Sequence, residues 1–455
     1  MSSLTLIIVV VFTCGYLCIA MESLTKVNKA AIALLMFVFC WTLFMVAPGS
    51  YIPIAPGQPV SLAVSEVIER HLGSTSTTLF FLMGAMTIVE LVDQNGGFNF
   101  VRDMLKTKSK RSLLWRIAIL TFFLSAILDN LTTSIVMIMV LRKLIEERKE
   151  RVIYASLVII AANSGGAFSP IGDVTTIMLW NRGVITALGV ILEIFIPSVI
   201  SMVIPAYILS LSLKGNMKAV TVRTNDVDND PLTPGQRKSI FFLGVGGLIF
   251  VPIFKSITHL PPFVGIMLVL GVLWTVTECF YRSLPHDNEE SGGKGMQKRI
   301  TKMLSRIDMG TILFFLGILM AVACLETIGV LTMLGEGLDV WFKGNHYLVT
   351  GIIGVLSSIV DNVPLVAGCM GMYPVTEVGD MAVDGIFWQL LAYCAGVGGS
   401  MLIIGSAAGV VVMGLEKITF GWYMKHITWV AFIGYIFGIL AYWLERTVID
   451  TFFAA

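Results

Sequence analysis

Apolar segments long enough to cross a membrane recur along nearly the whole chain. The ranges 4–20, 29–47, 239–254 and 262–281 contain few charged residues, as is typical of membrane-spanning helices. Charged residues make up only 13% of the 455 residues, and the mean hydropathy is +0.85, whereas soluble domains carry about 25% charged residues. The sequence therefore predicts an all-α polytopic membrane protein. It excludes a secreted disulfide scaffold, a nucleic-acid-binding protein and a cytosolic enzyme.

The same motifs occur twice at a nearly constant distance along the chain. Asp129-Asn130 and Asp361-Asn362 are 232 residues apart, and Gly165-Gly166 and Gly398-Gly399 are 233 residues apart. Matches at one offset indicate an internal duplication. We therefore divide the chain into a first repeat (1–213), a polar cytoplasmic linker (214–238) and a second repeat (239–455). Further apolar helices are expected at 77–95 and 184–213 in the first repeat, and at 309–329 and 427–444 in the second.

Basic residues flank both ends of the apolar pair that contains Asp129-Asn130. A single spanning helix would place one of these clusters outside, against the positive-inside rule, so we expect a re-entrant hairpin with Asp129-Asn130 at its tip. Each repeat then has about five spanning segments, one re-entrant hairpin and one interrupted helix, and this odd number of spans inverts the second repeat. With both termini on the periplasmic side, most of the 31 Lys and Arg residues lie in the cytoplasm. The residues expected on the outer side are Arg70, Arg182, Lys255, Lys343 and Arg446.

A Gly-rich stretch at 163–176 combines helix-breaking residues with side chains that carry oxygen atoms. Its counterpart at 396–409 keeps the glycines but offers only hydroxyl groups, among them Ser400 and Ser406. Non-helical backbone at membrane depth is tolerated where it is buried in protein or lines a cavity. Inverted repeats with broken helices are the architecture of secondary transporters. The side chains of the first stretch that could bind a ligand are Asn163, Ser164, Asp173, Thr175 and Thr176.

Acidic rather than basic side chains are expected at the centre of the membrane. Asp129, Asp173 and Asp361 lie in apolar segments, and such a site attracts a cation. Carboxylate, amide and hydroxyl oxygens suit a hard ion. Because desolvation raises the pKa of a buried carboxyl group and a nearby cation lowers it, one aspartate can hold either a proton or a metal ion. Competition for that site, with access alternating between the two sides, is the mechanism of an antiporter.

Each feature also has a simpler structural interpretation. The glycines could allow close helix packing, and the Asp-Asn pairs could cap helices. Two other functions remain open: a carrier of organic anions or oxyanions built on the same hairpin design, and an intramembrane enzyme with two aspartates as an acid–base dyad. Membrane carboxylates in symmetry-related positions favour a functional role. Four further acids, which could belong to a proton path or to helix contacts, are Glu90, Asp93, Glu193 and Glu326.

Four stretches, 128–133, 163–176, 360–365 and 418–429, resemble the NhaD-type sodium/proton antiporters of the ion transporter superfamily. The resemblance covers both repeats. It implies a transporter, not an enzyme, that exchanges Na+ or Li+ for protons across the bacterial inner membrane, favoured at alkaline pH. It also implies a homodimer whose mobile transport domain moves in elevator fashion against a scaffold domain. The lipid bilayer and the transported ions are then the partners, and neither a cofactor nor nucleic acid is required.

The same resemblance assigns the ion-binding residues by position. Dicarboxylate carriers of the superfamily have Ser-Asn-Thr at their hairpin tips, whereas this chain has an aspartate in place of that serine, which favours a cation over an anion. The residues expected to bind Na+ and the exchanged proton are Asp129, Asn130, Asn163, Asp173, Thr175, Thr176, Ser357, Asp361 and Asn362. Weaker candidates are Ser164, Ser400, Ser406 and Glu326.

Overall fold

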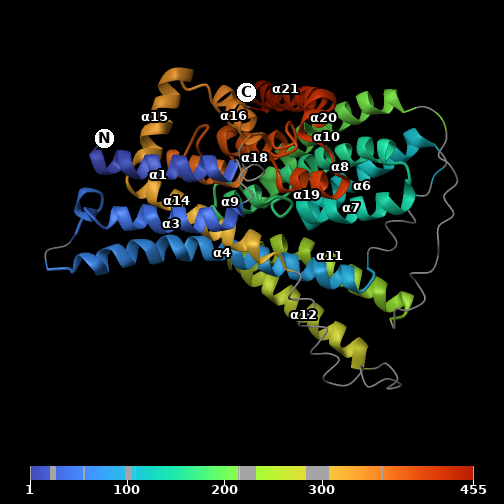
Figure 1. Ribbon diagram of the computed structural model, residues 1–455, viewed down its shortest axis with the longest axis horizontal. Coiled ribbons are helices and arrows are strands. Elements are labelled where there is room, and N and C mark those ends of the chain that lie inside the picture. The colour runs from blue at the N-terminus through green and yellow to red at the C-terminus, as the bar shows by residue number, and fades with distance from the viewer. Residues whose placement is uncertain are drawn as a thin grey trace.

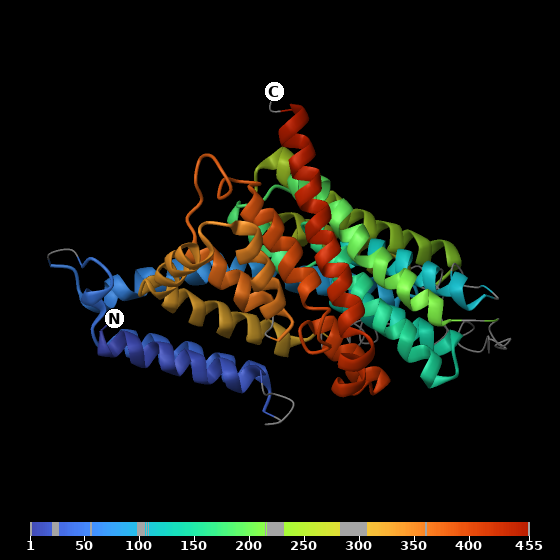
Figure 2. The same cartoon turned by 90° about the horizontal axis from the view of Figure 1, so that it is seen from above.

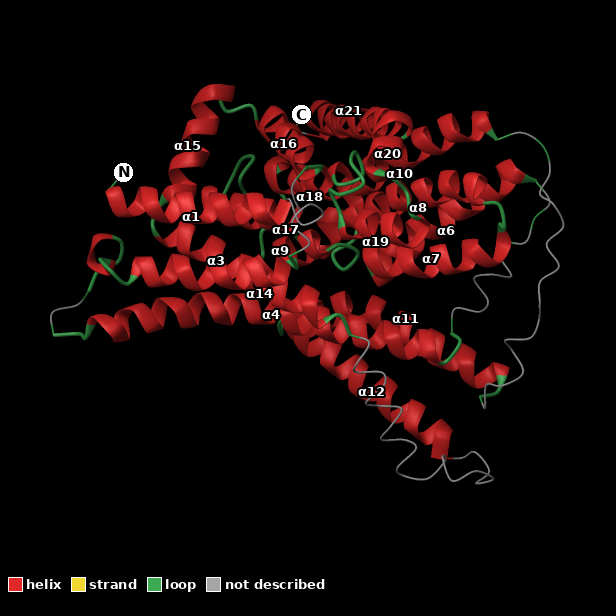
Figure 3. Cartoon of the chain, in the orientation of Figure 1, coloured by secondary structure: helices red, strands yellow, loops and turns green. Residues whose placement is uncertain are grey.

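The computed structural model describes residues 2–20, 27–54, 57–97, 105, 107, 109–213, 215, 232–282, 307–359 and 362–453. Within these ranges the chain folds as helices joined by loops, and no strand is formed (Figure 3). Seven of the described helices are long and apolar enough to cross a membrane. This confirms the prediction of an all-α polytopic membrane protein.

The described helices of the first part of the chain, up to the polar linker, include two pairs separated by short breaks, one at Asp129 and one at residues 168–173. Their bounds are α1 (Ser3–Ala20), α3 (Lys29–Phe44), α4 (Val60–Gln94), α6 (Lys110–Leu128), α7 (Asn130–Leu144), α8 (Arg148–Ala167), α9 (Val174–Arg182) and α10 (Ala187–Ser212), with a short 3₁₀ turn at Pro48–Ser50.

The second part of the chain repeats this order and adds two short helices. The bounds are α11 (Pro234–Thr258), α12 (Pro262–Arg282), α14 (Met309–Thr327), α15 (Val330–Phe342), α16 (His346–Ser357), α17 (Asn362–Met372), α18 (Ile386–Gly398), α19 (Ala407–Glu416), α20 (Phe420–His426) and α21 (Thr428–Phe453).

The helices pack as two groups. The flanking group consists of α1, α3, α4, α11, α12 and α14, which contact mainly one another, and the core group consists of α6 to α10 and α16 to α21 (Figure 1). Within the core group α21 lies along α10, as the view in Figure 2 shows. Helix α15 runs across the direction of α14 and contacts α14, α16 and α17.

Close backbone contact holds the flanking group together. A Cβ atom added at Gly317 of α14 would lie 2.6 Å from the carbonyl carbon of Ala33 in α3, so only glycine allows this approach. The indole Nε1 of Trp41 in α3 donates a 2.8 Å hydrogen bond to the carbonyl oxygen of Met320 in α14. Small residues at the contact and a satisfied indole N–H are the means by which helices associate in a membrane.

Equivalent glycines and serines make equivalent contacts in the two parts of the chain. A Cβ atom at Gly165 would collide with the carbonyl oxygen of Phe122, and one at Gly398 would collide with that of Gly354. Ser125 Oγ donates to the carbonyl of Ala162 at 2.6 Å. In the same way, Ser357 Oγ donates to the carbonyl of Ala395 at 2.8 Å. Such pairs are expected from a duplicated element, while the inverted orientation of the second repeat stays a prediction.

Short helices occur where hairpins are predicted. Helix α16 has 12 residues and α17 has 11, so each is at most about 18 Å long, too short to cross a hydrocarbon core of about 30 Å. Helices α6 and α7 contact each other and lie side by side in Figure 1, but α6, with 19 residues, is long and apolar enough to cross a membrane by itself. The lengths of α16 and α17 are compatible with a re-entrant hairpin, while both hairpins stay predictions.

Several predicted boundaries were wrong. Helix α4 begins at Val60 rather than at 77 and has 35 residues, about 52 Å of helix. Its polar first half, which includes Glu66, Glu69 and Arg70, hid its helical character from an analysis based on hydropathy. Helix α11 begins at Pro234, inside the predicted linker, because Thr233 and Gln236 form a capping box.

The close contact at Gly165 generates a prediction. Gly165→Ala and Gly398→Ala should each destabilise the protein by about 1–3 kcal/mol, because the added methyl group meets a backbone carbonyl that has no room to move. The apparent Tm of the detergent-solubilised protein measures this effect. Gly246→Ala and Gly271→Ala are matched controls, because a Cβ atom at either position meets no atom within 4 Å. Equal Tm values for all four variants would contradict the packing described here.

Candidate functional site

Four interruptions of helices meet inside the core group. Each interruption lies between the end of one helix and the start of the next. The four helix pairs are α6 and α7, α8 and α9, α16 and α17, and α18 and α19. Side-chain hydrogen bonds connect all four interruptions. Residues that are far apart in sequence are therefore brought to one buried position.

Asp173 lies at the centre of this arrangement and is 1% exposed. Its Oδ2 accepts a 2.7 Å hydrogen bond from Asn130 Nδ2 at the start of α7. Its Oδ1 accepts hydrogen bonds from Thr175 N and Oγ1, both at 2.9 Å, and a 3.4 Å hydrogen bond from Asn362 Nδ2 at the start of α17. One carboxylate thus joins groups from both repeats.

Asn163 connects the other half of the site. Its Oδ1 accepts a 3.0 Å hydrogen bond from Asn130 Nδ2. Its Nδ2 donates to Ser400 Oγ and Ser406 Oγ, both at 2.9 Å. The side chain of Asn163 is fully buried, so its amide both satisfies and aligns polar groups that would otherwise be unpaired in a medium of low polarity.

The helix starts at the site are capped by the site's own side chains. Asp129 accepts from Thr132 N at 2.8 Å and caps α7, Asp173 caps α9, and Ser406 accepts from Gly409 N at 3.1 Å and caps α19. The positive ends of these helix dipoles are therefore matched by protein groups rather than left open to an anion.

The backbone at Asp129 is strained. Its φ of 83° and ψ of 158° fall in a region that is essentially restricted to glycine. A residue stays in such a conformation only when the surrounding structure holds it there. Backbone strain of this kind is found most often at functional sites.

Comparison with known proteins agrees with this geometry. Residues 16–390 match the family described as citrate transporter. The sodium/proton antiporters 1 and 2 of Arabidopsis thaliana are 44% and 42% identical to the chain over 95% of its length, and the matches cover 71% and 97% of those proteins. The Na+/H+ antiporter NhaD of Alkalimonas amylolytica is 32% identical, with 84% of this chain and 80% of that protein covered. The chain belongs to the NhaD-type antiporter family. It is thus a membrane transporter and not an enzyme.

In this member of the family, most of the predicted site residues share one hydrogen-bonded network. Asn130, Asn163, Asp173, Thr175 and Asn362 are its inner members, and the weaker candidates Ser400 and Ser406 join it through Asn163. Thr176 borders the network with its hydroxyl bonded to the backbone carbonyl of Asp173 at 2.8 Å.

The other predicted residues have different surroundings. Ser164 is buried and accepts a 2.9 Å hydrogen bond from Ser201 of α10, while Ser357 bonds to a backbone carbonyl. Glu326 lies at the end of α14, in the flanking group, and its Oε1 is 3.4 Å from Arg182 Nη2. This contact is consistent with the helix-contact interpretation of Glu326. Asp361 lies outside the described residues.

Two hydroxyl groups near the site were missed by the analysis of sequence. Thr133 and Ser134 are fully buried, and among the described residues neither hydroxyl has a hydrogen-bond partner. They follow Asn130 by three and four positions, so all three lie on the same face of α7. That spacing is a signal that the sequence already contained. Tyr423 was missed as well, and its hydroxyl donates a 2.8 Å hydrogen bond to the carbonyl of Ser400.

The network around Asn163 generates a prediction. Asn163→Ala removes the amide that three partners share and leaves buried polar groups unpaired, so the protein should lose about 1–3 kcal/mol of stability or more. The apparent Tm measures the loss. Asn181→Ala is a suitable control, because its amide makes a single, longer hydrogen bond of 3.3 Å to Thr78. If the two variants melt at the same temperature, Asn163 does not organise the site.

Proposed function

We propose that this protein exchanges Na+ or Li+ for H+ across a membrane by alternating access. The observation that carries the proposal is the buried carboxylate of Asp173, which is bonded to amide and hydroxyl groups from interrupted helices of both repeats. The names of its relatives, sodium/proton antiporter and Na+/H+ antiporter NhaD, support the same ions.

The proposed exchange follows from the chemistry of Asp173 and Asp129. When Asp173 is ionised, its carboxylate and the nearby oxygens of Asn130, Asn163 and Thr175 offer the hard ligands that Na+ and Li+ prefer. When it is protonated, the neutral carboxyl group no longer holds a cation. A proton and a metal ion therefore compete for one site, and a second negative charge at Asp129 strengthens the attraction for either. If the metal ion is released on one side of the membrane and the proton on the other, the two ions move in opposite directions and their movements are coupled.

A carrier of organic anions is the second candidate, and the family description as citrate transporter favours it. An anionic substrate needs uncapped helix starts or basic side chains to receive its carboxylates. Here Asp129, Asp173 and Ser406 occupy three helix starts. Two of these side chains are acidic and would repel citrate, so we favour the cation.

Vesicle measurements test the proposal. Everted membrane vesicles that contain the protein should lose a respiration-driven pH gradient, seen as recovery of acridine orange fluorescence, when Na+ or Li+ is added at alkaline pH. Asp173→Asn should abolish the response, because an amide can neither take up the proton nor carry the charge that binds the cation. Glu336→Gln, which changes an exposed carboxylate on α15, should respond like the unaltered protein.

Two results would contradict this function. One is a full Na+ response in Asp173→Asn at equal protein abundance. The other is saturable uptake of radiolabelled citrate or succinate by the unaltered protein, without any effect of Na+ or Li+ on the pH gradient. The second result would establish the anion carrier in place of the antiporter.

We further propose that the core group moves as a transport domain against the flanking group, in elevator fashion. The division of helix contacts into two groups supports this. Polar contacts between the groups gather at the C-terminal end of α9, where Arg182 meets Glu326, and Asn181 Nδ2 lies 3.3 Å from Thr78 Oγ1 of α4. Our proposal also includes a homodimer in the bacterial inner membrane, as the family resemblance implies, with both termini on the periplasmic side, as the placement of basic residues predicts.

Cross-linking across the two groups tests the elevator movement. In a background without the seven native cysteines, Thr78→Cys with Asn181→Cys should lose exchange on treatment with a short thiol cross-linker and regain it on reduction. The matched control is Asn95→Cys with Tyr281→Cys, which joins α12 to the end of α4 within the flanking group, where the native side chains are hydrogen bonded at 2.6 Å. Unimpaired exchange by the first pair when fully cross-linked would exclude movement at this boundary.

A further inference from the structure

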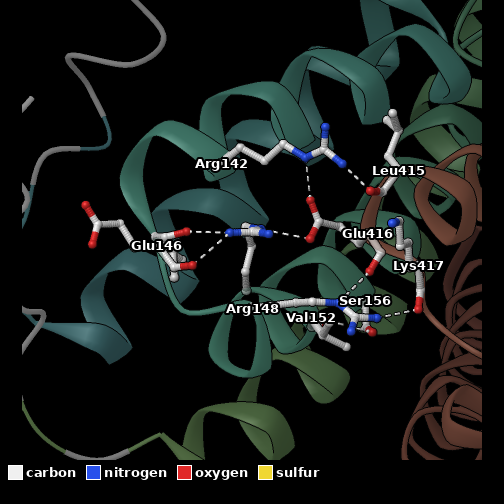
Figure 4. Close-up of polar contacts among 10 residues, drawn as sticks. Arg142, Glu146, Arg148, Val152, Ser156, Leu415, Glu416 and Lys417 are labelled. Carbon is white, nitrogen blue, oxygen red and sulfur yellow. Dashed lines mark hydrogen bonds and ion pairs between the residues drawn. The ribbon is translucent and has the colours of Figure 1, made fainter. Parts of the chain in front are cut away.

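A buried acid outside the cation site ends helix α19. The side chain of Glu416 is fully buried, and its two carboxylate oxygens bind different arginines. Arg142 Nε of α7 lies 2.8 Å from Oε1, and Arg151 Nε of α8 lies 2.8 Å from Oε2. Figure 4 shows Arg142 and Arg148 converging on the end of α19 from the neighbouring helices.

The backbone at this helix end is bound as well. Arg148 Nε donates to the carbonyl of Glu416 at 3.1 Å and its Nη2 to the carbonyl of Lys417 at 2.5 Å, and Arg142 Nη2 donates to the carbonyl of Leu415 (Figure 4). The last carbonyls of a helix lack partners within the helix and carry partial negative charge, so cations are favoured there. We call Arg142, Arg148, Arg151 and Glu416 the arginine cluster.

The opposite end of α19 is at the cation site. Ser406 caps the helix and accepts the 2.9 Å hydrogen bond from Asn163 Nδ2. Helix α19 has ten residues and packs against both α7 and α8. Those two helices also run from the site to the cluster, since α7 begins at Asn130 and contains Arg142, while α8 contains both Arg151 and Asn163. The cluster and the site are therefore the two ends of one three-helix unit.

The hydrogen bond between Asn163 and Ser406 depends closely on the position of α19 along its axis. A shift of α19 along its axis by one residue is about 1.5 Å, which is enough to break a hydrogen bond of 2.9 Å between Asn163 and Ser406. The hydrogen bonds and ion pairs of the arginine cluster hold the other end of α19. They connect a helix from the second repeat to a hairpin and an interrupted helix from the first.

We propose that Glu416 is a positioning residue, which with its arginines sets the axial position of α19 and so holds the Ser406 hydroxyl at the cation site. This rests on the proposed function, because the effect on exchange requires that Ser406 contributes to cation binding. The basic residues beyond the first hairpin then have a second role besides topology. Their guanidinium groups bind the end of the helix that brings Ser406 to Asn163.

Two measurements test the proposal on the full-length protein. In vesicles, Glu416→Gln should raise the apparent KM for Na+ about tenfold, the effect of weakening one hydrogen bond at the site, with a smaller change in maximal rate. In a Ser406→Ala background the same substitution should cause no further rise, because its effect passes through Ser406. Arg148→Gln, which leaves the buried ion pairs in place, should act in the same direction. Glu147→Gln is the matched control, because Glu147 is exposed and lies between α7 and α8.

Thiol labelling reports on the position of α19 without any transport. Ser406 is 2% exposed, so Ser406→Cys in the cysteine-free background should react slowly with a small methanethiosulfonate, and adding Glu416→Gln should raise the rate about tenfold. An unchanged labelling rate in folded protein, or KM effects of Glu416→Gln and Ser406→Ala that simply add, would overturn the proposal. If the unaltered protein shows no response to Na+, the proposed function fails, while labelling still decides whether Glu416 positions Ser406.

Discussion

The structure depends on one constraint, that a helix interrupted inside a membrane must still satisfy its peptide groups. Four interruptions meet in the core group, and the side chains that solve this problem are those that form the candidate site. Asp129, Asp173 and Ser406 cap the helices that start there, and Asn163 pairs with hydroxyl groups of the opposite repeat. Because capping and ligand binding use the same oxygen atoms, the polar groups that allow the fold are also those available to an ion.

This shared use explains why the alternatives raised by the sequence do not exclude one another. Asp129 and Asp173 are both helix caps, as the structural interpretation held, and Asp173 is also a buried acid in a polar network. The glycines bring helices into backbone contact, α8 against α6 and α18 against α16.

Most of the residues that the sequence predicted for the site lie together in the structure, whereas several predicted helix boundaries were wrong. The offset of about 232 residues between Asp-Asn pairs predicted the helix breaks that begin α7 and α17, because polar residues in apolar segments stand out and repeat. Glu326 was placed among the weaker site candidates because it is also an acid in an apolar segment, yet it contacts Arg182 at the boundary between helix groups. The length of α4 and the start of α11 were missed because hydropathy detects apolar stretches and not the polar turns that extend a helix.

By itself, the sequence determined that the chain is a helical membrane protein with a few acids inside its apolar segments, because apolar length, charge placement and repeated motifs can be read directly from the order of residues. The comparisons with relatives then supplied the family. Only the tertiary structure decided which polar groups meet: that Asn362 reaches Asp173 across 189 positions in sequence, and that three arginines bind the far end of the helix that carries Ser406. Contacts of this kind depend on how the helices of the two repeats pack together, and no local pattern of residues encodes that packing.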